Sequence, residues 1–180
     1  MNIIFVIITV LWLAEFLIFP SLKKENQSRQ KSFFLILFSI LTIIIINAVM
    51  YFKDLLLVEN TLLKIIALMI YLTGLILRYW SLILLGNNFS REVEVANDQE
   101  LISHGTYKYI RHPLYLGLFL LVIAVPLFFG NLLVFLSSIL IMFLAISFRI
   151  KEEESFMEAV LGSRYLSWKN KRFKFLPFIY

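Results

Sequence analysis

A short stretch of the sequence, His104–Gly117, gathers polar and aromatic side chains in a chain otherwise made of apolar runs. His112 and Pro113 stand directly before one of these runs. Proline is favoured in the first turn of a helix, because its missing N–H would have no partner there. Unpaired backbone N–H groups and the positive end of the helix dipole then converge near His112. The stretch therefore predicts an anion-binding site at the start of an apolar helix.

A second polar group, Arg149 and Glu153, follows the last apolar run. Its members are four positions apart, so on a helix they share one face. The turn signal at 130–131 separates two apolar runs, which predicts a helical hairpin whose open ends lie side by side. We therefore expect His112, Tyr115, Arg149 and Glu153 to form one site. It would hold an imidazole, a phenol, a cation and a carboxylate next to lipid.

Each of these residues also has a less specific interpretation. Arg149 can be a cation that stops membrane insertion, with Glu153 as its partner on the same helix. His112 before a proline can be an ordinary helix cap. Three tyrosines can belong to the aromatic belt of a membrane boundary: Tyr107, Tyr109 and Tyr115. The neighbouring carboxylates of Glu152 and Glu154 are expected to be solvated.

Composition limits the class of protein. The chain has 180 residues, of which 61% are hydrophobic and 16% charged, and its mean hydropathy is +0.86. These values indicate a single membrane domain, 1–180, rather than a soluble protein. The net charge of +5 is better explained by basic membrane flanks than by nucleic-acid binding. The absence of cysteine excludes disulfides, cysteine-bound metals and thiol catalysis, and we predict no metal site.

The apolar runs predict an all-α integral membrane protein with five transmembrane helices. The expected spans are about 3–19, 32–52, 62–85, 114–129 and 132–148. The first is not expected to be a signal peptide, since no basic residue precedes it and no small-residue cleavage site follows. After the last span, the pattern predicts an amphipathic continuation ending near Gly162, then an interfacial tail of aromatic and basic residues.

Charges place the spans relative to the membrane. Glu15 is expected to face the interior or the interface, and Arg78 to reach the interface by extending its long stem. All Lys and Arg residues except Lys53 and Lys64 fall on one side of a five-span topology. The positive-inside rule then puts the N-terminus outside. It puts the polar segment 86–111 and the predicted pocket on the cytoplasmic side.

Two blocks of the sequence resemble the isoprenylcysteine carboxyl methyltransferase family of integral-membrane enzymes and the related phospholipid methyltransferases. The first block runs from Leu101-Ile102-Ser103-His104-Gly105-Thr106-Tyr107 to Arg111-His112-Pro113-Leu114-Tyr115-Leu116-Gly117. The second consists of Arg149, Glu153-Glu154, Leu161-Gly162, Tyr165 and Pro177. The resemblance covers roughly Leu75 to Pro177, with the catalytic part at about 86–180.

The resemblance implies a methyltransferase that binds S-adenosyl-L-methionine without a Rossmann fold. It implies that Arg149 holds the carboxylate of an isoprenylcysteine-like substrate. The cofactor would be bound by ten residues: Gln99, Glu100, Leu101, Ile102, Tyr107, His112, Pro113, Leu114, Tyr115 and Glu153. The expected partners are membrane lipids and a lipid or prenylated substrate, either a small molecule or a protein.

Three other functions stay open at this level. A phospholipid N-methyltransferase would use the same cofactor but accept the methyl group on an amine. A reductase of sterol-like lipids dependent on NADPH shares part of the arginine–histidine–aromatic pattern. A small scaffold or transporter would need no cofactor, although a transporter is expected to have ionisable or broken-helix positions near mid-membrane. Binding of S-adenosylmethionine or of NADPH would separate these classes.

Overall fold

The computed structural model describes residues 1–19, 31–86 and 101–175. Within these ranges the regular structure is helical, apart from one isolated β-bridge. The helices are α1 (Asn2–Ile18), α2 (Lys31–Phe52), α3 (Thr61–Leu85), the 3₁₀ helix η3 (Gly105–Lys108), α4 (Pro113–Phe128), α5 (Leu132–Leu161) and α6 (Ser163–Lys169). Gln99 and Glu100, two of the expected cofactor-binding residues, lie outside the described ranges.

The apolar runs and the helices coincide closely. Helices α1, α2, α3 and α4 begin and end within one residue of the first four predicted spans. Helix α5 includes both the fifth span and its amphipathic continuation up to Gly162. By length and composition, α2, α3 and α5 are able to cross a membrane. The apolar helices α1 and α4 have 17 and 16 residues. At 1.5 Å per residue they are about 26 and 24 Å long, slightly short of a bilayer core of about 30 Å.

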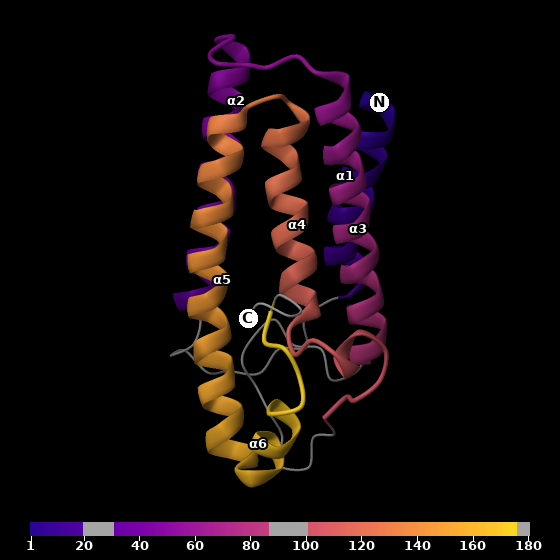
Figure 1. Cartoon of the computed structure of the whole chain (residues 1–180), viewed down its shortest axis with the longest axis vertical. Coiled ribbons are helices and arrows are strands. Elements are labelled where there is room, and N and C mark those ends of the chain that lie inside the picture. The colour runs from indigo at the N-terminus through magenta and orange to yellow at the C-terminus, as the bar shows by residue number, and fades with distance from the viewer. Residues whose placement is uncertain (20–30, 87–100, 176–180) are drawn as a thin grey trace.

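Helix α4 lies at the centre of the bundle, with α3 and α5 beside it (Figure 1). Helix α1 packs against α3, and α2 packs against α5. Almost every side of α4 is apolar, and residues such as Leu121 and Ala124 are fully buried. A helix that is apolar all round is stable only when neighbours or lipid cover it. Here the other helices provide much of that cover.

Two glycines allow α3 and α4 to approach closely. A Cβ added at Gly74 would lie 2.9 Å from the carbonyl oxygen of Gly117, and one added at Gly117 would lie 2.7 Å from Cγ of Arg78. Either contact is shorter than side chains tolerate. Small residues serve the same purpose in other membrane helix pairs, where close backbone approach replaces hydrophobic driving force. The starting turns of α4 are therefore held against α3.

A buried ion pair joins α1 to α3. The guanidinium of Arg78 donates from Nε and Nη2 to the two carboxylate oxygens of Glu15, which is fully buried. Nη1 of Arg78 lies 3.4 Å from the carbonyl oxygen of Leu114, in the first turn of α4. The expectation that Glu15 faces the interior is confirmed. The expectation that Arg78 extends to the interface is wrong, because its carboxylate partner is inside the bundle.

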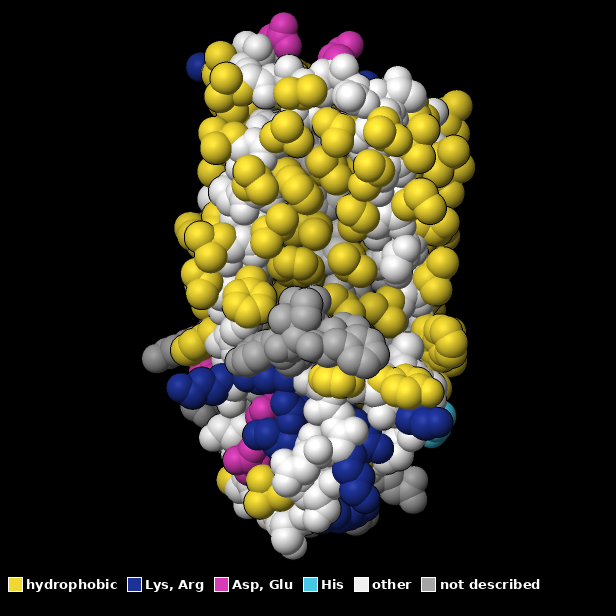
Figure 2. Space-filling model, in the orientation of Figure 1, with side chains coloured by type: hydrophobic (Ala, Val, Ile, Leu, Met, Phe, Trp, Pro, Cys, Tyr) yellow, Lys and Arg dark blue, Asp and Glu magenta, His cyan; other side chains and the backbone are white. Residues whose placement is uncertain are grey.

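The surface divides into an apolar band and a polar end. Figure 2 shows apolar side chains along most of the molecule, and Lys, Arg, Asp and Glu gathered below them. The last turns of α5 and all of α6 lie in this lower part (Figure 1). The residues expected to do chemistry therefore lie where the apolar band ends.

Candidate functional site at the polar end of the bundle

The centre of the site is the hydroxyl of Tyr115, in the first turn of α4. It accepts a hydrogen bond from Nε of Arg149 at 3.0 Å and donates one to Oε2 of Glu153 at 2.8 Å. Arg149 is 3% exposed, and its Nη1 also donates to the hydroxyl of Ser32 on α2 at 2.9 Å. Three helices thus fix the position of one guanidinium. The side chains of Tyr115, Arg149 and Glu153, which the sequence predicts to lie together, are in direct contact.

The imidazole of His112 lies beside this group, with its ring centroid 5.9 Å from that of Tyr115. His112 is the N-cap residue of α4, but its side chain caps no backbone N–H. Its Nε2 instead lies 3.1 Å from Oε1 of Glu154. The interpretation of His112 as an ordinary helix cap is therefore wrong, because the ring is engaged by a carboxylate of α5.

Glu154 is the centre of a cluster of cationic groups. It is 5% exposed, and besides His112 it pairs with Nε of Arg111 at 3.2 Å and Nζ of Lys169 at 3.1 Å. The expectation that Glu154 is solvated is wrong. The turn of α5 points Glu154 away from Glu153 and toward the segment before α4. Three cationic or ionisable partners then compensate the cost of burying it.

The C-terminal segment holds the loop that precedes α4. Nε1 of Trp168 on α6 donates to the carbonyl of Ile102 at 3.0 Å, and Nε of Arg172 donates to the carbonyl of Tyr107 at 2.8 Å. A parallel β-bridge pairs Ile110 with Phe173. Ile102 and Tyr107 are expected cofactor-binding residues. Residues about 65 positions apart therefore shape this wall of the site together.

The tail is only partly the interfacial segment that its composition predicts. Tyr165 is fully buried, and Phe175 is 1% exposed and packs edge-on against Phe119 of α4. These two aromatic residues belong to the interior, because the tail folds back onto the bundle. Burial raises the pKa of Tyr165, as it does that of Tyr107 in η3. The hydrogen bond that Nζ of Lys169 donates to Oε1 of Glu158 raises the pKa of Lys169.

Several buried polar atoms near the site have no hydrogen-bond partner among the described residues. They are Oγ1 of Thr106, Oε2 of Glu152 and the hydroxyl of Tyr165. A buried polar group without a partner costs roughly 1–3 kcal/mol. Such atoms are commonly satisfied by water or a bound ligand. The three atoms at this end suit a polar ligand with several donors and acceptors.

Most of the predicted site residues that the structure describes lie in this region. Pro113 starts α4, and Leu114, Tyr115 and His112 stand in or next to its first turn. Tyr107 is buried, and Leu101 and Ile102 are partly buried under α6. Tyr109 is 60% exposed and is the one tyrosine of the three that remains at the surface.

Five residues at this end were not among the site residues predicted from the sequence. They are Ser32, Arg111, Glu154, Tyr165 and Lys169. The pair of adjacent glutamates could have indicated a second contact for Glu154, since neighbouring positions on a helix face different parts of the structure. Nothing near Ser32 in the sequence indicates that it meets Arg149, which is 117 positions away.

A solved structure has a fold similar to that of this chain. The chain is similar to a eukaryotic intramembrane Ras methyltransferase, isoprenylcysteine carboxyl methyltransferase, with a TM-score of 0.72. The match covers 97% of this chain and 63% of that one, at 24% sequence identity. The shared property is the helical fold.

The sequence identifies the family. Residues 65–159, more than half of the chain, match the model of the isoprenylcysteine carboxyl methyltransferase family, and the chain belongs to this family. It is 34% identical to the protein-S-isoprenylcysteine O-methyltransferase of Xenopus laevis over 67% of this chain and 43% of that protein. It is 33% identical to the Saccharomyces cerevisiae protein of the same name over 52% and 40%. The chain thus matches less than half the length of these relatives.

Proposed function

We propose that this protein transfers a methyl group from S-adenosyl-L-methionine to the carboxylate of an isoprenylcysteine-like, lipid-linked acceptor. The proposal rests on family membership and on one observation in particular. Arg149 is held at the edge of the apolar band by hydroxyl groups from two other helices. A buried, oriented guanidinium beside an apolar environment suits a substrate with a carboxylate head and a hydrocarbon body.

In this proposal Arg149 binds and orients the acceptor. Its planar fork pairs with a carboxylate through two parallel hydrogen bonds, which a lysine is unable to reproduce. The bonds to Tyr115 and Ser32 restrict rotation of the guanidinium about its stem. An acceptor carboxylate then approaches in one direction, with one oxygen directed at the methyl donor. Restriction of this kind is a large part of what an enzyme contributes to a displacement reaction.

The residues at this end have the donors and acceptors that S-adenosyl-L-methionine requires. Glu153 offers carboxylate oxygens to an ammonium or a ribose diol, and the hydroxyls of Thr106 and Tyr165 are buried without partners among the described residues. The start of α4 at His112 and Pro113 suits a carboxylate. When bound, the cofactor supplies an electrophilic methyl group on a sulfonium.

We assign cofactor binding to the predicted set: Gln99, Glu100, Leu101, Ile102, Tyr107, His112, Pro113, Leu114, Tyr115 and Glu153.

An acceptor that is already a carboxylate needs no general base. The protein instead has to orient its groups and exclude water, and the burial of Tyr107, His112 and Arg149 supports exclusion of water. An amine acceptor, as in a phospholipid N-methyltransferase, would bring an ammonium toward Arg149. Repulsion between like charges disfavours that reaction, so we favour the carboxylate.

We further propose that α1 and α4 cross the membrane along with α2, α3 and α5. Neighbouring helices cover α4, so its length does not have to match the lipid thickness closely. A short apolar helix is also accommodated by local thinning of the bilayer. Five crossings with the basic end inside place the N-terminus outside and the site in the cytoplasm. Because the sequence has no cysteine, a single cysteine introduced at either end can be labelled with a membrane-impermeant thiol reagent to show on which side of the membrane that end lies.

The direct test is a methyl-transfer assay on the purified full chain in lipid nanodiscs. We expect radiolabelled methyl to pass from S-adenosyl-L-methionine to an S-farnesylated N-acetylcysteine, but not to the same compound with its carboxylate converted to an amide. Arg149→Lys should lower kcat/KM at least about tenfold, which corresponds to the loss of one charge-assisted hydrogen bond.

The matched control is Arg164→Lys, which makes the same change at an exposed position of α6. It should leave kcat/KM unchanged. Equal turnover by Arg149→Lys would contradict the role of Arg149, and equal methylation of the amide would contradict the carboxylate as acceptor. Failure to bind S-adenosyl-L-methionine at all would contradict the whole assignment.

A further inference from the structure

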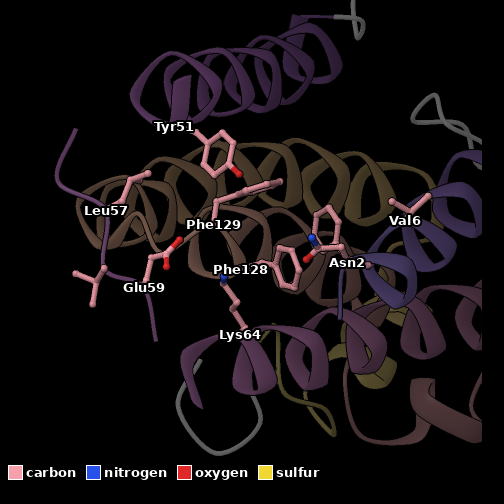
Figure 3. Close-up of a pocket in the computed structure, with 10 residues that line it drawn as sticks. Asn2, Val6, Tyr51, Leu57, Glu59, Lys64, Phe128 and Phe129 are labelled. Carbon is pink, nitrogen blue, oxygen red and sulfur yellow. The ribbon is translucent and has the colours of Figure 1, made fainter. Parts of the chain in front are cut away.

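A cavity lies at the opposite end of the bundle from the candidate functional site. Its volume is about 290 Å³, and its walls come from the first turns of α1 and α3, the last turns of α2 and α4, and the α2–α3 loop (Figure 3). The polar lining residues are Asn2, Glu59 and Lys64. No residue of this cavity belongs to the methyl-transfer site.

The inner wall of the cavity is aromatic. The rings of Phe5 and Phe128 are stacked with centroids 4.3 Å apart, and Phe129 meets Phe5 edge-on at 5.5 Å. Tyr51 of α2 meets Phe129 at 5.0 Å and extends the same wall. These contacts make the aromatic wall a packed, preformed surface. Such a surface suits an apolar group and costs little to organise on binding.

Two opposite charges stand at the same cavity. Lys64 extends from α3 toward Phe128, and Glu59 lies at the cavity edge on the preceding loop (Figure 3). Among the described residues, neither side chain forms an ion pair with the other or with a third group. The cavity therefore offers a cation and an anion, separately, to one ligand. That pattern fits a zwitterion better than an ion of single charge.

The position of the cavity narrows the kind of ligand. Its residues come from helix ends at the upper limit of the apolar band, where acidic and basic side chains reappear (Figure 2). Once the helices cross a bilayer, this level is where phospholipid headgroups lie. Val6 of the cavity is 57% exposed and faces outward beside the aromatic wall. An acyl chain is able to continue from the cavity along that surface.

We propose that this cavity binds the headgroup of a zwitterionic phospholipid of the phosphatidylethanolamine type. Lys64 pairs with the phosphate, Glu59 pairs with the ammonium, and the glycerol and first acyl carbons pack against Phe5 and Phe128. The lipid belongs to the leaflet opposite the methyl-transfer site. It joins α1, α3 and α4 at an end where the protein has no ion pair of its own among its described residues.

The test is native mass spectrometry of the delipidated full chain in detergent. The chain is titrated with phosphatidylethanolamine or phosphatidylglycerol of identical acyl chains. We expect one phosphatidylethanolamine to bind roughly fivefold more tightly than phosphatidylglycerol, which lacks the ammonium. Lys64→Gln and Glu59→Gln should each weaken that binding by about the same factor, as expected for one interfacial charge contact.

The matched controls are Lys53→Gln and Asp54→Asn, which remove the same charges at the same end but outside the cavity. They should leave lipid binding unchanged, and circular dichroism checks that every variant keeps its helices. Equal binding of both lipids, or equal loss in the controls, would overturn the proposal. Displacement of the lipid by soluble phosphoethanolamine at equal concentration would also overturn it, since the site would then bind a free phosphoester. None of these outcomes bears on methyl transfer.

Discussion

The two buried glutamates Glu15 and Glu154 show how differently the apolar band and the polar end handle charge. Glu15 lies inside the band and has its two oxygens bound by a single residue, Arg78. Glu154 lies at the polar end and pairs with three residues from two segments: Arg111 and His112 before α4, and Lys169 of α6. Glu15 belongs to an ion pair whose arginine also lies 3.4 Å from the carbonyl oxygen of Leu114. Glu154 belongs to a network of three cationic or ionisable partners, and it holds the imidazole of His112 directly.

The difference follows from the surroundings. In the band no water is available, so a charge survives only with a partner that compensates it fully, and the cost of breaking the pair falls on the fold. At the polar end, cations near water tolerate rearrangement, so the same carboxylate is available to orient a functional group. We therefore expect mutations in the band to affect stability first, and mutations at the polar end to affect activity first.

The largest expected effect is on stability, from breaking the pair in the band. Glu15→Leu leaves the Arg78 cation without its carboxylate inside the bundle. It should lower the free energy of unfolding by about 3–5 kcal/mol. Arg78→Leu should have a similar effect. The double variant should recover most of the loss, because leucines bury no charge. Denaturant unfolding in detergent micelles measures all three, and a double variant as unstable as the single ones would show that the pair does more than neutralise itself.

A smaller effect is expected from the network at the polar end. Glu154→Gln removes a charged acceptor from His112, Arg111 and Lys169. It should cost about 1.5–3 kcal/mol of stability, the range for hydrogen bonds to charged groups. Because His112 loses its orientation, the affinity for S-adenosyl-L-methionine should fall more than in the Glu15→Leu, Arg78→Leu double variant. Isothermal titration measures both.

The control for this comparison is Glu158→Gln, which removes a partly exposed carboxylate that pairs with Lys169. It should affect cofactor affinity little. If Glu154→Gln lowered stability but left cofactor affinity at the level of the control, the network would be structural, and the contrast between the two glutamates would disappear.

The smallest effect is expected at Ser32, where a neutral hydroxyl contacts the guanidinium of Arg149. Ser32→Ala should weaken the binding free energy of the acceptor by about 0.5–1.5 kcal/mol, the usual value of one hydrogen bond. It should appear as a roughly two- to tenfold rise in KM for the acceptor, with the KM for the methyl donor unchanged. Ser32→Thr keeps the hydroxyl and should restore most of the affinity.

Ser39→Ala is the control on the same helix, because among the described residues that buried hydroxyl bonds to the carbonyl of Leu35 and not to Arg149. It should leave both KM values unchanged. A rise in the donor KM in Ser32→Ala would show that α2 contributes to the cofactor site instead of the acceptor site.

The features that depend on hydropathy along the chain were the most predictable from the sequence. Lipid and buried helix faces both exclude polar residues, so the ends of apolar runs became helix ends, and Pro113 began α4 as predicted. The grouping of Tyr115 with Arg149 and Glu153 was also predictable. A short turn between two helices leaves few ways to place their open ends.

The positions of side chains whose neighbours are distant in the sequence were predicted wrongly. Arg78 was expected to extend outward because it lies near the end of its span and has a long stem, whereas its partner Glu15 lies 63 positions away in the sequence. Glu154 was expected to be solvated, as was Glu152. Its burial depends on Lys169 of α6 folding back against α5. Tyr165 and Phe175 were assigned to the interface for the same reason.

The sequence by itself determined the helical segments, their limits and the gathering of polar residues at one end. These depend on hydropathy, which each residue carries with it. Only the tertiary structure decided which polar groups meet, including Ser32 with Arg149 and His112 with Glu154. Those meetings depend on how each helix is rotated and how closely it packs. At this end of the bundle, both are set by the glycine contact between α3 and α4 and by the return of the C-terminal segment.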